Sequence, residues 1–120
     1  MEDEVADVQL EQLVSRRAAT RLRAFRRDAE RAFPGQVVRV LLFGSRARGE
    51  ARRDSDYDVA IFLRDLVDRR STGHALADLA YPHLIEGYHI NPVALPDDYL
   101  ERGDTGSLRF SIARDGIAVT

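Results

Sequence analysis

Two aspartates at the head of an apolar segment, Asp56 and Asp58, are the residues best suited to chemistry in this chain. The segment Tyr57–Leu63 (YDVAIFL) has the composition of a β-strand, in which residues two apart point to the same face. Both carboxylates then project together, while Tyr57, Val59 and Ile61 point into the core. Two ionised carboxylates at such a distance repel each other unless a cation lies between them. The economical explanation is Mg²⁺, which takes oxygen ligands and shares them with substrate phosphates. The alternative is structural: residues 54–56 form a turn, and Asp58 is paired with an arginine.

A glycine and a serine follow directly on another apolar run, Val37–Phe43 (VVRVLLF). Gly44 permits a sharp turn and lets a ligand approach closely, because it has no Cβ. Ser45 can cap a short helix beginning at Arg46, which leaves backbone N–H groups free to bind a phosphate. Arg46 and Arg48 add positive charge beside it. A phosphate-binding turn next to a metal held by aspartates suits phosphoryl or nucleotidyl transfer.

The elements around these motifs predict one small α/β domain spanning 1–120, with a helical region at 1–33 and an α/β core at 36–120. From about Val8 to Phe33, apolar residues recur every three or four positions, which indicates one long helix or two nearly collinear ones. The other expected elements are strands at Val37–Phe43, Tyr57–Leu63 and Tyr88–Leu95, helices at Gly73–Leu84 and Ser107–Arg114, and an edge strand at Ile117–Val119. The first two strands are joined without a crossover helix, so at least one pair should be antiparallel. We therefore expect a small mixed sheet of three or four strands, with helices packed on one face.

Composition excludes several rival chemistries. The chain has no cysteine, and all 18 of its basic residues are arginine, so thiolate sites, disulfides and every lysine chemistry are absent. The missing cysteines, the lack of a membrane-length apolar run and the acidic N-terminus predict a cytoplasmic protein with no membrane partner. The net charge of −2 conceals a basic block, because residues 16–53 carry 12 arginines against three acids. This block adjoins the Gly-Ser motif and could attract an anionic substrate.

Other candidate motifs are weaker. A Walker motif needs a lysine, and the three histidines lack the spacing of a zinc site. We expect His83 to lie on a helix face, and His89 has some chance of lying near the site. The tyrosines at 81, 88 and 99 are expected in the core rather than stacked on a base. Binding of nucleic acid by the arginine-rich helix is disfavoured by the interleaved acids Asp28 and Glu30.

The two motifs together resemble the signature of the minimal nucleotidyltransferases, within the DNA polymerase β-type nucleotidyltransferase superfamily. Gly-Ser-Arg-Ala-Arg-Gly and Asp-Ser-Asp-Tyr-Asp-Val match it in order and spacing, and the similarity runs from about residue 18 to 119. The resemblance implies a polymerase β-like palm fold, with Gly44 and Ser45 as the NTP phosphate site and Asp56 and Asp58 as Mg²⁺ ligands. It also implies an antitoxin role beside a helical HEPN-type ribonuclease toxin, to whose tyrosines such proteins transfer AMP.

One position departs from that pattern. The family usually supplies a third carboxylate from a later strand, where it acts on the attacking hydroxyl, but the matching residue here is Asn91. An amide oxygen can ligate a metal, whereas an amide cannot act as a base near neutral pH. Glu86 could substitute, although it precedes the expected strand.

Two functional hypotheses follow. The first is Mg²⁺-dependent transfer of a nucleoside monophosphate, AMP from ATP, to a hydroxyl of a HEPN-family protein encoded nearby. The second is a catalytically degenerate nucleotide-binding module that neutralises its toxin by binding, which the asparagine at position 91 favours. The sequence leaves self-association into a homo-oligomer open.

Overall fold

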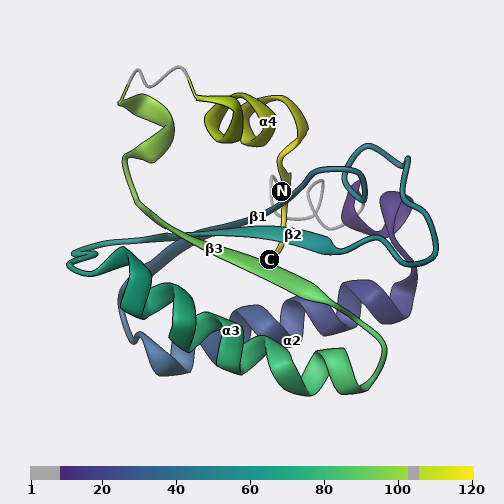
Figure 1. Cartoon of the computed structure of the whole chain (residues 1–120), viewed down its shortest axis with the longest axis horizontal. Coiled ribbons are helices and arrows are strands. Elements are labelled where there is room, and N and C mark those ends of the chain that lie inside the picture. Colours follow the sequence, from purple (N-terminus) through teal and green to yellow (C-terminus); the bar gives the residue numbers. More distant parts are fainter. Residues whose placement is uncertain (1–8, 103–105) are drawn as a thin grey trace.

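The computed structural model describes residues 9–102 and 106–120, which form a four-stranded mixed sheet with helices on both of its faces (Figure 1). The strands are β1 (Val37–Phe43), β2 (Tyr57–Leu63), β3 (Ile90–Pro96) and β4 (Ile117–Ala118), and the helices are α2 (Arg16–Ala32), α3 (Arg69–Ile85), α4 (Ser107–Asp115) and the 3₁₀ turn η1 (Tyr99–Glu101). The spatial order of the strands is β3-β2-β1-β4. The pairs β1–β2 and β1–β4 are antiparallel, and β2–β3 is parallel. The expected mixed α/β sheet is confirmed.

The N-terminal helical region consists of two helices. Residues 9–13 form a short helix, and α2 begins after a break at Ser15. The side chain of Ser15 accepts a hydrogen bond from the backbone N–H of Ala18 at 3.0 Å, which is the N-cap arrangement that starts a new helix. Of the two alternatives from the sequence, the structure has two helices rather than one long one; the expected first residue, Val8, lies outside the described residues.

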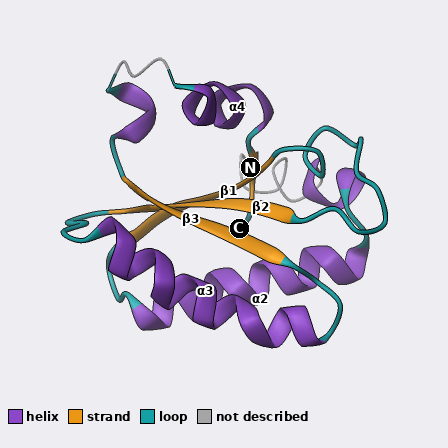
Figure 2. Ribbon diagram, viewed as in Figure 1, coloured by secondary structure: helices purple, strands orange, loops and turns teal. Residues whose placement is uncertain are grey.

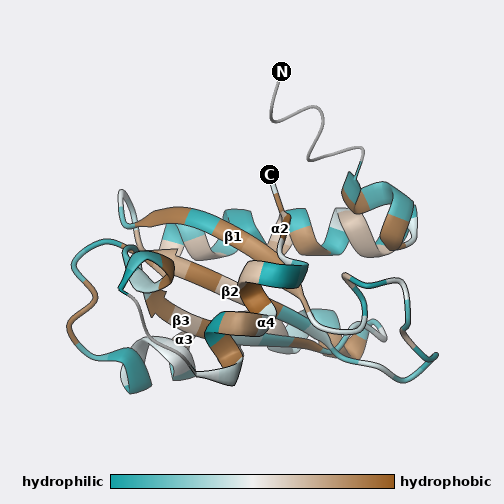
Figure 3. Cartoon of the chain, turned by 90° about the horizontal axis from the view of Figure 1, so that it is seen from above, coloured by the Kyte–Doolittle hydropathy of each residue, from teal (hydrophilic) through white to brown (hydrophobic). Residues whose placement is uncertain are grey.

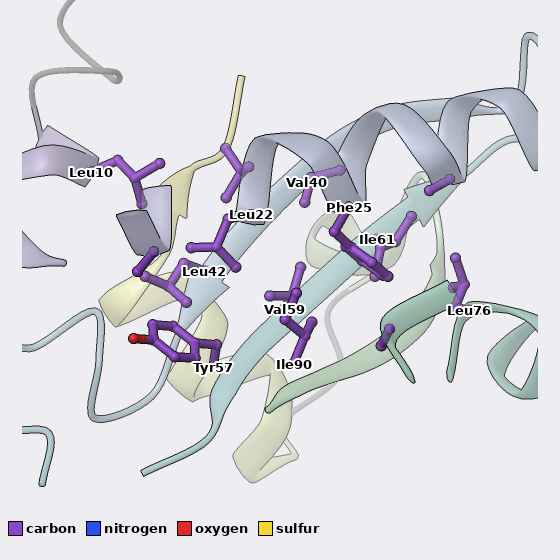
Figure 4. Packing of buried hydrophobic residues seen from close by; sticks show 14 of the residues in the cluster. Leu10, Leu22, Phe25, Val40, Leu42, Tyr57, Val59, Ile61, Leu76 and Ile90 are labelled. Atoms are coloured by element: carbon purple, nitrogen blue, oxygen red, sulfur yellow. The ribbon is translucent and has the colours of Figure 1, made fainter. Parts of the chain in front are cut away.

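The larger hydrophobic core lies between the sheet and the helices α2 and α3. In Figure 4, Leu22 and Phe25 of α2 point toward Val40 of β1 and Ile61 of β2. These four side chains are at most 2% exposed. Burying each one contributes about 1.5–3 kcal/mol, so this face holds the two long helices against the sheet.

A second core lies on the opposite face, beneath α4 and η1. It contains Phe62, Leu95, Tyr99 and Ile112 among its buried members. Figures 2 and 3 show α4 crossing this face of the sheet, away from α2 and α3. The expectation of helices on one face thus holds for α2 and α3, whereas α4 covers the other face because Ile112 is buried there.

Several boundaries differ from the expected ones, and the first residues of α3 and β3 differ most. Helix α3 begins four residues before Gly73, because the carboxylate of Asp68 caps it by accepting from the N–H of Ser71 at 3.1 Å. Strand β3 starts at Ile90 rather than Tyr88 and extends to Pro96.

Within the described part of the chain, no helix has the length and apolar content needed to cross a bilayer.

Candidate active site

The turn after β1, residues 44–50 and called the Gly-Ser turn below, lies against the second aspartate of the motif. Gly44 has a φ of +80°, and a Cβ built there would lie 2.5 Å from Oδ2 of Asp58. The carbonyl of Gly44 accepts hydrogen bonds from the N–H groups of Ala47 and Arg48, both at 3.1 Å. The expected short helix after Ser45 is therefore a tight turn. Among the described residues, the N–H groups of Ser45 and Arg46 have no acceptor, so they remain available to an anion.

The aspartates stand where β2 begins, at the same end of the sheet as the Gly-Ser turn. Because β1 and β2 are antiparallel, the end of β1 meets the start of β2, and Phe43 pairs with Asp58. Tyr57, Val59 and Ile61 point into the core beneath α2 and α3, as expected. The side chain of Asp58 consequently points to the α4 face of the sheet.

Strand β3 places a polar partner beside each carboxylate. In the parallel β2–β3 ladder, Asp58 is opposite Asn91, and Nδ2 of Asn91 donates to Oδ1 of Asp58 at 3.1 Å. Two residues earlier, Nδ1 of His89 lies 2.8 Å from Oδ1 of Asp56. Asn91 therefore lies beside Asp58, and its match to the third carboxylate of the family stays a prediction. His89 does lie near the site, because the parallel register of β2 and β3 brings it there.

Neither aspartate is neutralised by an arginine. In the described residues no guanidinium lies within ion-pair distance of Asp56 or Asp58, so the structural alternative that paired Asp58 with an arginine is wrong. No group of three His, Cys, Asp or Glu side chains in those residues could hold a metal by itself. Two carboxylates without an arginine partner in the described residues are nevertheless a donor set that fits a divalent cation shared with substrate phosphates.

Arg46 and Arg48 are both engaged within the protein. Arg46 donates to the carbonyl of Ser55 from Nε at 3.2 Å and from Nη2 at 2.9 Å, and its guanidinium stacks over the ring of Tyr57 at 4.3 Å. It therefore holds the loop that leads into Asp56. Arg48 pairs with Glu50 at 2.6 Å and with Asp115 at 2.8 Å, and these hydrogen bonds raise its pKa further. Sequence reasoning missed Asp115, because only the fold brings the end of α4 to the turn.

The remaining candidates lie outside this cluster. Glu86 ends α3 and pairs with Arg21 at 3.6 Å, so it does not take the place of the third carboxylate. His83 lies on a helix face, as expected, and is buried. The expectation of core tyrosines is right for Tyr99, which is 9% exposed, and wrong for Tyr81, which is 60% exposed.

Comparison with known families decides what this arrangement is. The sequence profile of a family described as "Nucleotidyltransferase domain" matches residues 22–117, which include the Gly-Ser turn and both aspartates. The chain belongs to the nucleotidyltransferase domain family. The resemblance found in the sequence is confirmed, and the palm-like α/β fold is the fold of a nucleotidyltransferase domain.

Two solved structures resemble this nucleotidyltransferase domain. One is a mutant of the MntA–HpeT toxin–antitoxin, with a TM-score of 0.51 and 19% identity. The other is a toxin–antitoxin with AMP-PNP, with a TM-score of 0.51 and 20% identity. Each comparison covers 82% of this chain and 72% of the other. At such identities the likeness shows a shared fold. No protein with a curated description matches the chain.

Proposed function

We propose that this nucleotidyltransferase domain is a Mg²⁺-dependent enzyme that transfers AMP from ATP to a hydroxyl of a partner protein, in the cytoplasm. The observation that carries the proposal is the close approach of Gly44 to Asp58, which puts a turn with free N–H groups beside a carboxylate that no arginine of the described residues pairs with. The family membership and the AMP-PNP of one structural neighbour support it.

The chain's own residues divide into three roles. The N–H groups of Ser45 and Arg46 bind the phosphates of the nucleotide, while Arg46 fixes the loop before Asp56. Asp56 and Asp58 would hold the metal, which would neutralise the charge that develops on the α-phosphoryl group as its bond to the leaving pyrophosphate breaks. Strand β3 bounds the opposite side, so the acceptor hydroxyl approaches past His89 and Asn91. Asn91 orients Asp58 through its hydrogen bond but takes no proton from the acceptor.

The partner that we propose is the helical HEPN-type toxin of a toxin–antitoxin pair. Both structural neighbours are toxin–antitoxin structures. In this proposal the surface of the partner supplies the acceptor specificity.

The test is transfer of label from α-³²P-ATP, with Mg²⁺, to the product of the neighbouring gene. We expect labelled partner with the unaltered chain, and a loss of at least about 100-fold with Asp56→Asn or Asp58→Asn, because each change removes a metal-binding charge. Asp54→Asn is the matched control: it lies in the same loop, is exposed, and should leave transfer unchanged.

A second function is favoured by the asparagine at position 91, which leaves the site without a third carboxylate. The domain would then bind nucleotide and neutralise the toxin by covering it. A stable complex without label transfer, unaffected by either aspartate substitution, would establish this function and overturn the enzyme.

A further inference from the structure

Asp56 and His89 form a hydrogen-bonded pair at the edge of the candidate active site. Nδ1 of His89 lies 2.8 Å from Oδ1 of Asp56, with the imidazole 56% and the carboxylate 41% exposed. An ionised carboxylate only accepts hydrogen bonds, so Nδ1 carries the hydrogen and donates it. Because both side chains are about half exposed, the pair contributes little to the stability of the fold. What the contact does fix is the direction of the carboxylate.

The main chain on both sides of this pair is held in place. Asp56 directly precedes β2, and the N–H of Tyr57, the first residue of β2, donates to the carbonyl of His89 at 2.8 Å. On the other side of Asp56, the guanidinium of Arg46 donates to the carbonyl of Ser55. With both main-chain segments fixed, the rotation of the Asp56 side chain decides where its carboxylate points. The hydrogen bond from His89 limits that rotation.

Asp58 is held in a comparable way from the same side. Nδ2 of Asn91, two residues after His89, donates to Oδ1 of Asp58 at 3.1 Å, while Oδ2 of Asp58 faces Gly44. Each aspartate therefore gives one oxygen to a donor at or just before β3. Within residues 9–102 and 106–120, the second oxygen of each aspartate accepts no hydrogen bond. One oxygen of each carboxylate is thus held, and the other is left for a ligand.

We propose that His89 is a positioning residue for the divalent cation, which holds Oδ1 of Asp56 and leaves the other oxygen of this carboxylate free for the cation. The inference rests on the proposed binding of Mg²⁺ by the two aspartates. A direct bond from His89 to the cation is not supported, because no three His, Cys, Asp or Glu side chains of the described residues are placed to hold a metal together. His89 therefore acts through Asp56, as the hydrogen-bonded outer partners of metal-binding carboxylates commonly do.

The affinity of the full chain for Mn²⁺, followed by electron paramagnetic resonance of the free ion, tests this role without turnover. His89→Phe keeps a planar ring and removes the donor. We expect it to weaken Mn²⁺ binding about tenfold, the lower end of the effects of such outer partners, because the pair is half exposed. His89→Asn keeps an N–H at the same distance from the main chain as Nδ1, so it should restore most of the affinity. The matched control is His74→Phe, the same change at an exposed histidine of α3, which should leave the affinity unchanged.

The imidazole of His89 reports the contact in a second measurement that needs no metal. Long-range proton–nitrogen NMR spectra at about pH 8, well above the ordinary pKa of histidine, identify the ring nitrogen that carries the hydrogen. We expect the Nδ1–H form for His89 in the unaltered chain. In Asp56→Ala we expect the Nε2–H form, which free neutral histidine prefers. Exposed His74 should show the Nε2–H form in both proteins.

The outcomes separate the positioning role of His89 from the proposed metal site. If Mn²⁺ binds and Asp58→Asn weakens it, while His89→Phe binds as the unaltered chain does, the positioning role is overturned and the metal site stands. An Nε2–H form of His89 in the unaltered chain, or equal losses in His89→Asn and His89→Phe, would also overturn the role. If the unaltered chain binds no Mn²⁺, or if neither Asp56→Asn nor Asp58→Asn affects its binding, the metal site itself fails and the positioning role fails with it.

Discussion

A single missing methyl group lets the two halves of the nucleotidyltransferase motif meet. The φ of +80° at Gly44 is a conformation that L-residues rarely adopt, and a Cβ there would collide with the carboxylate of Asp58. Asp58 cannot move aside freely, because Asn91 donates to its other oxygen. The glycine is thus required both by backbone conformation and by the close approach of a proposed metal ligand.

Gly44→Ala should therefore damage stability and nucleotide binding together. We expect the free energy of unfolding to fall by about 1–3 kcal/mol, from backbone strain and displacement of Asp58. ATP affinity should fall at least about tenfold, because the Gly-Ser turn and the carboxylate of Asp58 move apart. Urea unfolding and calorimetric titration with ATP and Mg²⁺ measure the two effects. Gly73→Ala is the control, because Gly73 lies in helix α3 with open space around it and should gain up to about 1 kcal/mol. An alanine at 44 that preserved both quantities would contradict this account.

At the scale of elements, α4 and the Gly-Ser turn are joined by one buried carboxylate. Asp115, the last residue of α4, receives hydrogen bonds from Arg114 at 2.8 Å and from Arg48 at 2.8 Å. The bond from Arg114 contributes most to holding the pKa of Asp115 below its usual value, against the opposing effect of burial. The helix on one face of the sheet thereby positions the turn at the strand ends.

Asp115→Asn tests this connection while keeping the side chain's shape. The amide removes the anion that Arg114 pairs with and one of the two that Arg48 pairs with, so we expect a loss of about 1–2 kcal/mol in the free energy of unfolding. The turn should also be held less firmly, which weakens ATP binding several-fold. Asp98→Asn removes an exposed i,i+4 pair with Arg102 and should cost less than about 0.5 kcal/mol. Equal effects of the two substitutions in urea unfolding would show that Asp115 does not fix the turn.

At the scale of the whole molecule, a buried histidine makes the stability of the fold depend on pH. His83 is 5% exposed, its Nδ1 has no hydrogen-bond partner among residues 9–102 and 106–120, and its ring packs edge-on against Phe25. Burial lowers the pKa of His83, and Asp28, 3.7 Å from Nε2, offsets this only in part. The folded protein thus binds this proton less readily than the unfolded chain does.

Stability should therefore fall as the pH drops below about 6.5, the ordinary pKa of histidine. Below pH 6.5 the unfolded chain binds a proton at His83, whereas the folded chain binds it less readily. Well above pH 6.5, His83 contributes no pH dependence to the free energy of unfolding. The loss from this group is at most about 1.4 kcal/mol per pH unit. In urea unfolding between pH 7.5 and 5, we expect His83→Leu to have a shallower slope than the unaltered chain. Exposed His74→Gln should keep the original slope. Parallel curves for His83→Leu and the unaltered chain would rule out this role.

The strands and the motif were predictable from sequence, while the partners of the motif were not. Strands β1 and β2 match their predicted bounds. Each is a short apolar run rich in β-branched and aromatic residues, which favours a buried strand, and Gly44 ends the first of them. The position of α4 was not predictable, since Ile112 is buried while Phe110, in the same short helix, is 61% exposed. The contacts of His89 with Asp56 and of Asp115 with Arg48 depend on strand register and helix placement, which no local pattern encodes.

Arg46, Tyr57, Tyr88 and Arg21 form a column of stacked side chains that affects the near-ultraviolet spectrum of the protein. The chain has four tyrosines and no tryptophan, and two of those tyrosines, Tyr57 and Tyr88, stand in the column. Half of the chain's tyrosines therefore lie in this column, which begins at the Gly-Ser turn. We therefore expect the near-ultraviolet circular dichroism of these tyrosines to change when a ligand binds at the Gly-Ser turn, without any attached dye.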